Sequence, residues 1–170
     1  MANVDNPKGL YPVGHLTGGE IRTQSYPMTA SKTLYKGDIL KVVAAGTVEA
    51  SAADDGLIVV GVAAEYKVSG ATVVVNIQVY DDPNIIFGVQ ADTGTAVAAT
   101  AVFATANHVA GSGSTTTKLS GHELDSSDIG TGAQLKILGM IDEPNNSWAE
   151  HVDLRVIFNE HLYKAAVAGV

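Results

Sequence analysis

The chain has 170 residues, enough for one domain with a real core, and its apolar content of 46% comes mostly from Ala and Val, with only 6% aromatic residues. It has no cysteine, which excludes disulfides, thiolate metal sites and a cysteine nucleophile. The net charge is −8, and residues 51–170 hold fourteen Asp and Glu against five Lys and Arg, so nucleic-acid phosphates would repel this part and we expect no nucleic-acid partner.

Residues 1–34 are predicted to form an extended N-terminal arm. Pro7, Pro12 and Pro27, with four glycines between the first and the last of them, leave no uninterrupted window for a helix and few positions for a paired strand. The arm has no basic stretch followed by an apolar stretch. The longest apolar run of the chain, 57–64, has eight residues. We therefore expect neither a signal peptide nor a membrane span.

From residue 35 the pattern changes to short apolar runs separated by turn residues. The first five predicted strands are 39–43, 47–50, 57–66, 71–80 and 85–91. The clearest of them is 71–80, where Val73, Val75, Ile77 and Val79 alternate with other residues, as expected for a half-buried strand.

The second half of the chain is less regular. Residues 96–110 are rich in alanine and weakly fit a helical face, so one short helix is predicted there, followed by a flexible loop over 111–117. Two further strands are predicted over 134–141 and 152–159. Short strands with frequent turns favour a mainly β fold, a compact barrel or sandwich over 35–170, with at most one short helix.

Residues that carry catalytic chemistry occur without the spacing that this chemistry needs. The five histidines form no HxH or HExxH pattern, and the glycine-rich stretch 111–114 lacks the Lys-Ser/Thr of a phosphate loop. Ser120, His122 and Asp125 are close in sequence, but no nucleophile-elbow motif accompanies them. We therefore expect no enzyme activity, no metal site and no cofactor.

The segments 81–84 and 142–145 share the pattern acid-acid-Pro-Asn, each directly after an apolar strand. Paired carboxylates can act as acid and base or hold a cation. The same residues are ordinary turn formers, because Pro fixes φ and Asp or Asn bonds the nearby backbone. We favour the interpretation as turns.

Pro12–Gly19 resembles the opening of a family of small tailed-bacteriophage virion proteins, the capsid decoration or cement proteins. Further matching segments are Tyr80–Asn84, Val89–Asp92, Gly113–Thr117, Glu123–Asp125, Leu138–Gly139 and Asn159–His161. Each is short, but in order they span nearly the whole chain. The resemblance implies a structural virion protein without enzyme activity that bridges neighbouring capsomers. It also implies a homotrimer seated near three-fold or quasi-three-fold axes.

The resemblance also implies a partner and a place: the major capsid protein, on the outer capsid surface of the virion, after synthesis in the host bacterial cytoplasm. The alternative is a virion-surface binding module, such as a head fibre or a host-glycan binder, which would need exposed aromatic side chains on a shallow groove. An enzyme is the third possible class of protein, and the sequence contains no set of residues with the spacing of a known catalytic site.

The arm is the predicted attachment site, because it is nearly neutral and its apolar residues must pack against something. These apolar residues could pack against the body of the same subunit, against a neighbouring subunit or against the capsid. We favour the last two together. Deleting residues 2–25 is then expected to leave a folded body that no longer binds. The candidate contact residues are Leu10, Tyr11, Val13, His15, Leu16, Thr17, Gly18, Gly19, Ile21, Tyr26 and Met28.

Overall fold

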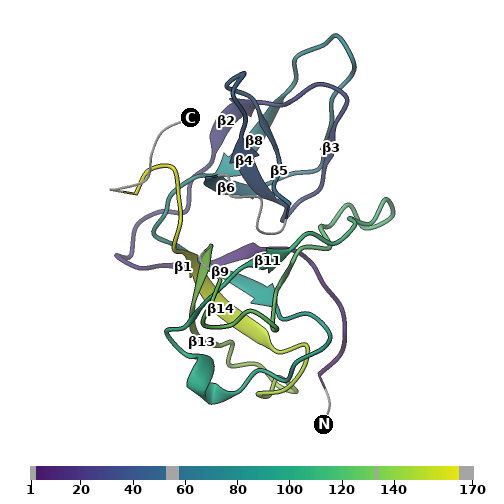
Figure 1. Cartoon of the computed structure of the whole chain (residues 1–170). Coiled ribbons are helices and arrows are strands. Elements are labelled where there is room, and N and C mark those ends of the chain that lie inside the picture. Colours follow the sequence, from purple (N-terminus) through teal and green to yellow (C-terminus); the bar gives the residue numbers. More distant parts are fainter. Residues whose placement is uncertain (1–2, 53–57, 133, 165–170) are drawn as a thin grey trace.

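The computed structural model describes residues 3–52, 58–132 and 134–164, and the regular secondary structure of these residues is almost entirely β-strand. Two five-stranded antiparallel sheets form an upper and a lower lobe (Figure 1). The only helical element among the described residues is one 3-10 turn, η1 (Ala99–Ala101). The predicted mainly β fold with at most one short helix is confirmed. No described helix has the length and apolarity needed to cross a membrane.

Both sheets are open and have two edge strands each. The lower sheet has the order β1 (Tyr11–His15), β9 (Ile85–Gln90), β14 (Asp153–Phe158), β13 (Leu135–Met140) and β10 (Thr105–Ala106). The upper sheet has the order β2 (Gln24–Pro27), β8 (Asn76–Tyr80), β6 (Val59–Ala63), β4 (Ile39–Val42) and β5 (Val48–Ala50). Two small ribbons pair β3 (Thr33–Leu34) with β7 (Lys67–Val68) and β11 (His108–Val109) with β12 (Glu123–Leu124).

Most predicted strands agree with the structure because their apolar residues alternate. In β13 and β14 every second residue is buried, so one face of each strand lies in the core. The strands predicted over 39–43, 47–50, 85–91, 134–141 and 152–159 correspond to β4, β5, β9, β13 and β14. Of the predicted strand 57–66, residues 59–63 form β6, and Leu57 lies outside the described residues.

The strand predicted over 71–80 is shorter than its apolar alternation suggests. It begins at Asn76, opposite Pro27, and this pair ends the ladder between β2 and β8. Val73 and Val74 are 62% and 73% exposed in the bend before it. The alternation there marks no buried face, because no strand lies beside these residues.

Strand β6 separates two hydrophobic clusters and is buried on both faces. Val59 and Val62 pack in the cluster of the lower lobe, whereas Val60 and Ala63 pack in that of the upper lobe. Gly61 lets the strand turn its side chains from one cluster to the other. It has a φ of +152° and lies beside a register shift in the pairing with β4. A Cβ at this position would be 2.1 Å from the carbonyl oxygen of Tyr80, so only glycine fits. Strand β6 therefore contributes side chains to the cores of both lobes.

The N-terminal segment is extended, as expected, but it is not separate from a body that starts at residue 35. Strand β1 pairs with β9 in the lower sheet, and β2 and β3 pair with β8 and β7 in the upper part. Leu10 and Met28 are 2% and 1% exposed, one in each cluster. Pro12 and Pro27 fit because β1 and β2 are edge strands, where a missing N–H breaks no ladder bond.

The helix predicted over 96–110 is reduced to η1. Phe103 has a φ of +70°, which ends any helical path, and its backbone N–H donates to the carbonyl oxygen of Ile137 at 2.8 Å. Residues 105–106 then pair with β13 as the edge strand β10. Strand pairing replaces the predicted helix because Thr105, Asn107 and His108 follow the alanines and favour extended backbone.

Deletion of residues 2–25 is therefore expected to unfold the protein, contrary to the sequence-based expectation of a folded remainder. The deletion removes β1, half of β2 and the buried side chain of Leu10, and truncation of one buried leucine alone costs about 2–5 kcal/mol. The measurement is circular dichroism with thermal unfolding. A truncated chain that unfolds cooperatively at the wild-type temperature would contradict the integral role of the segment.

Candidate interaction surface and polar clusters

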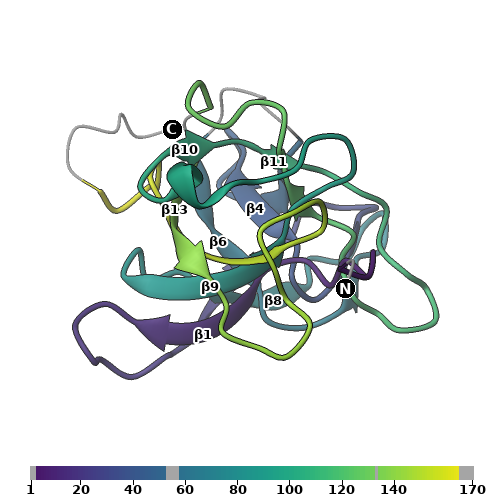
Figure 2. The ribbon, with the colours of Figure 1, turned by 90° about the horizontal axis from the view of Figure 1, so that it is seen from below.

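The loop between β1 and β2 carries exposed apolar side chains. Leu16 is 50% and Ile21 is 37% exposed, and Val13, within the adjoining strand β1, is 42% exposed. The loop extends from β1 at the margin of the molecule (Figure 2). Glu20 and Arg22 are the only Asp, Glu, Lys or Arg residues between positions 9 and 31, so the surface is apolar and electrically balanced.

His15 holds the first part of this loop in one conformation. Its Nδ1 accepts hydrogen bonds from the backbone N–H of Thr17 at 3.3 Å and of Gly19 at 3.0 Å. The proton therefore sits on Nε2, which donates to Asp82 Oδ2 at 3.2 Å. Gly18 has a φ of +72°, and a Cβ on Gly19 would lie 2.8 Å from the imidazole, so both glycines are required by the geometry.

The 81–84 turn is the support on which this loop rests. Asp82 Oδ1 accepts from the backbone N–H of Asn84 at 2.8 Å, and the Asn84 carbonyl accepts from the N–H of Leu16 at 2.9 Å. Burial acts to raise the pKa of Asp82, but the hydrogen bonds from Asn84 and His15 outweigh it and hold this pKa below its ordinary value. The carboxylate of Asp82 is thus engaged within the turn and with the loop.

The second acid-acid-Pro-Asn segment is also a turn, between β13 and β14. Asn145 adopts a φ of +67°, and the side chain of Asn146 donates to the carbonyl oxygens of Ile141 and Asp153 at 2.8 and 2.9 Å. The interpretation of both segments as turns is confirmed. The two are not equivalent in the fold, because 81–84 connects the two lobes whereas 142–145 closes a hairpin.

The eleven candidate contact residues divide between core and surface. Leu10 and Met28 are buried in the chain's own clusters and are unavailable to a partner. Three residues are partly buried against the same subunit: Tyr11, whose ring covers Gly88; His15; and Tyr26, which donates to Asp81. The exposed remainder consists of Val13, Leu16, Thr17, Gly18, Gly19 and Ile21.

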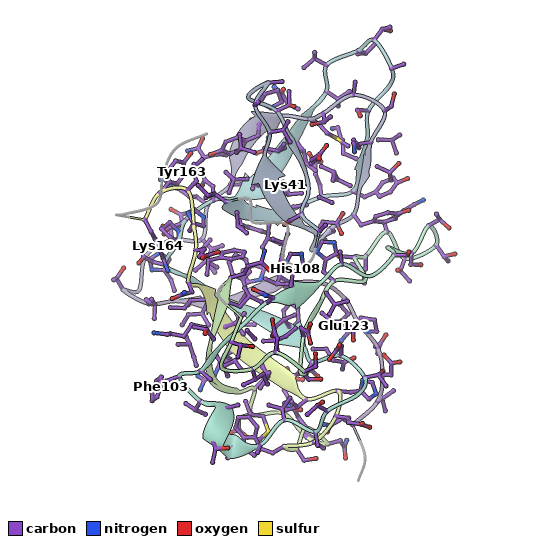
Figure 3. All side chains as sticks on the ribbon, viewed as in Figure 1. Lys41, Phe103, His108, Glu123, Tyr163 and Lys164 are labelled. Carbon is purple, nitrogen blue, oxygen red and sulfur yellow. The ribbon has the colours of Figure 1, made fainter. Side chains whose placement is uncertain are left out.

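The sequence did not predict the exposure of several other apolar side chains. Val68, Val73 and Val74 lie on the upper lobe, and Phe103 is 73% exposed on the lower lobe, where its side chain points outward (Figure 3). Periodicity gave no sign of them, because an apolar residue in a strand-like or helix-like pattern is expected to be buried. A left-handed backbone at Phe103 is what turns its ring away from the core.

Ser120, His122 and Asp125 do not form a catalytic relay. Ser120 Oγ accepts from the backbone N–H of His122 at 3.0 Å, and Asp125 Oδ1 accepts from the N–H and hydroxyl of Ser127. The imidazole of His122 accepts instead from the N–H of Ile39, through Nδ1, at 3.2 Å. Ser120 is 1% exposed, so its hydroxyl has no access to a substrate.

A buried polar cluster joins the two lobes. The rings of His108 and His122 stack with centroids 5.1 Å apart, and Figure 3 shows His108 between the lobes. His108 Nδ1 lies 2.7 Å from Gln134 Oε1 and its Nε2 lies 3.2 Å from the carbonyl oxygen of Ser51. Across the stack, His122 Nε2 faces Asp38 Oδ1 at 3.6 Å. Residues of the upper lobe thus meet polar partners from the lower lobe.

Burial controls the protonation of this cluster. Desolvation, with the charge of His108 adding to it, lowers the pKa of His122 to about 3. Desolvation raises the pKa of Asp38, although hydrogen bonds from Ser120 and the backbone of Tyr35 act against it. A hollow of about 300 Å³ opens beside His122 and Asp38. The cluster is therefore a contact between the lobes in which His122 is neutral near pH 7.

A second group of ionisable side chains lies in the lower lobe. Asp5, Glu123 and His151 each place one ligand atom within 4.8 Å of the others. Burial, with the charges of Asp5 and Asp92 adding to it, raises the pKa of Glu123 to about 7. The motif search missed this group, because its three members come from distant parts of the sequence and share no local spacing.

Comparison with models of known protein families, with curated proteins and with solved structures finds no significant match for this chain.

The stability of the protein is expected to fall as the pH is lowered from about 7 to 4. His122 titrates near 6.5 when unfolded and at about 3 when folded, so the unfolded state binds more protons over this range. The stability that neutral His122 contributes is complete above pH 6.5, and its loss has a slope of at most about 1.4 kcal/mol per pH unit. Urea unfolding at a series of pH values measures it.

His122→Asn is the matched variant, because an amide oxygen can accept from the N–H of Ile39 without titrating. Its pH dependence should be shallower, because the loss from His161, whose pKa burial lowers to about 4, is opposed by Glu123, whose pKa burial raises to about 7. Equal slopes in the wild type and the variant would show that His122 is not the titrating group.

Proposed function

We propose that the protein is a non-enzymatic decoration protein on the outer surface of a tailed-bacteriophage capsid, where it binds the major capsid protein and stabilises the shell. The observation that carries the proposal is the loop between β1 and β2. Its first part is fixed by His15 and Asp82, and the loop is electrically balanced and exposes Leu16 and Ile21 to solvent. A preformed apolar surface loses little conformational entropy when it binds.

The segments that carry the resemblance support one another in space. Pro12–Gly19 rests on Tyr80–Asn84 through the His15–Asp82 contact and the hydrogen bond from Leu16 to Asn84. Val89–Asp92 lies beside Glu123–Asp125, because Ala91 and Leu124 form a bridge. Segments far apart in sequence are thus contact partners, which is expected when a family pattern reflects a common structure.

The mechanism in this proposal is thermodynamic linkage. A protein that binds the assembled shell and not its separated subunits lowers the free energy of the assembled state. The shell repeats the site many times, and an oligomer presents several loops at once, so modest affinity per loop is enough.

Trp148, Tyr35 and Tyr66 give little support to the glycan-binding alternative. Trp148 packs against the lower cluster, and Lys118 lies over the ring of Tyr66 at 4.5 Å. Tyr66 also contacts Tyr35, whose other neighbour is the backbone of Gly113. The described residues therefore offer no open aromatic platform around Tyr35 and Tyr66 for a sugar ring.

The double variant Leu16→Ser and Ile21→Ser is expected to bind decoration-free capsids at least ten-fold more weakly than the wild type. Burial of one such side chain is worth about 1.5–3 kcal/mol, and 1.4 kcal/mol corresponds to a factor of ten. Co-sedimentation over a range of protein concentrations measures the affinity. The unfolding temperature should change little, because both side chains are exposed.

The matched control is Val73→Ser with Val74→Ser, which removes two exposed apolar side chains from the upper lobe. It should bind as the wild type does. Unchanged binding of the loop variant, or an equal loss in the control, would refute the loop as the contact surface.

The protein is also expected to be a homotrimer in solution, because the resemblance implies three copies around a three-fold axis and the chain has no disulfide to stabilise it. Light scattering coupled to size-exclusion chromatography gives the mass. A monomer of 17.5 kDa at micromolar concentration would contradict this part of the proposal.

A further inference from the structure

Three segments of the lower lobe bring Asp5, Glu123 and His151 together. Asp5 lies on the N-terminal segment before β1, Glu123 begins β12, and His151 lies in the turn before β14. Figure 3 shows Glu123 within the lower lobe. The ligand atoms of the three side chains all lie within 4.8 Å of one another, and His151 Nδ1 is 4.0 Å from Asp5 Oδ1.

Two of these atoms are buried without a partner. Glu123 Oε1 and His151 Nδ1 are shielded from solvent and have no hydrogen-bond partner among the described residues. A buried polar atom left unsatisfied costs about 1–3 kcal/mol. Both atoms belong to the same cluster, so one bound species between them would satisfy both.

The segments that carry the three side chains are held firmly. The side chain of Gln90 accepts from the N–H of Asn6 at 2.7 Å and donates to the carbonyl of Val4 at 3.1 Å, on either side of Asp5. Asn3 donates to the carbonyls of Ser147 and Glu150 at 2.8 Å each, which ties the same segment to the turn that carries His151. The cluster is thus built on fixed backbone.

We propose that Asp5, Glu123 and His151 form a binding site for one divalent transition-metal ion, with zinc as the expected ion. Two carboxylates and an imidazole are ligands that zinc accepts, and a nitrogen ligand disfavours calcium and magnesium. Three protein ligands leave a fourth position for water. The two carboxylate charges balance the two charges of the ion.

The geometry requires a contraction of the cluster. Ligand atoms about 2.1 Å from a tetrahedral zinc ion lie about 3.4 Å apart, so the 4.0 Å between His151 and Asp5 must shorten by about half an ångström. A pair at the 4.8 Å limit must shorten by about 1.4 Å. The side chain of Asp5 is 60% exposed, which lets it move and gives the ion a path from solvent. The bound ion ties the N-terminal segment to β12 and to the turn before β14.

The test is calorimetric titration of the tag-free full chain with zinc chloride, after dialysis against a chelator and then against chelator-free buffer. We expect one zinc ion per chain and a higher unfolding temperature in its presence. Asp5→Asn and Glu123→Gln should each weaken zinc binding at least ten-fold. Asp5→Asn changes an exposed side chain, so its folding is secure even if Glu123→Gln alters the core.

Glu20→Gln is the control, because it removes one exposed carboxylate outside the cluster. It should bind zinc as the wild type does, with an unchanged rise in unfolding temperature. Less than half a zinc ion per chain in the wild type would overturn the proposal. Equal affinities in the wild type and Asp5→Asn would overturn it too, and neither outcome bears on capsid binding.

Discussion

Strand β6 has no face in solvent, and the arrangement of both sheets depends on it. Val59 and Val62 belong to one cluster and Val60 and Ala63 to the other, so each lobe completes its core with residues of the same strand. The exchange of faces needs a residue without a side chain, and Gly61 supplies it against the carbonyl of Tyr80. Neither lobe has a complete core without this strand, which makes the chain one folding unit.

The N-terminal segment follows from this arrangement. It forms an edge strand of each sheet, with Leu10 buried in one cluster and Met28 in the other. The connection between the two strands must leave the body, and the His15–Asp82 contact keeps it ordered there. The exposure of Leu16 and Ile21 is thus a consequence of how the segment connects the sheets, and it is the surface on which the proposed attachment to a capsid rests.

Strand positions could be predicted from the sequence wherever alternation coincided with a neighbouring strand, as in 135–140 and 153–158. Alternation failed at Val73 and Val74, because a pattern of side chains does not reveal where the partner strand ends. The prolines of the N-terminal segment were correctly seen to exclude a helix, but edge strands tolerate them. The cluster of Asp5, Glu123 and His151 could not be predicted, because only folding brings its members together.

The central claim is that the loop between β1 and β2 is the surface through which the protein meets a capsid. An electron cryo-microscopy map of the virion that carries this chain tests it most directly. The account predicts trimers on the outer surface at the three-fold or quasi-three-fold axes, with Leu16 and Ile21 of each copy packed against the major capsid protein. A map in which this loop faces solvent while another surface contacts the shell, or in which the chain is absent from the particle, would contradict it.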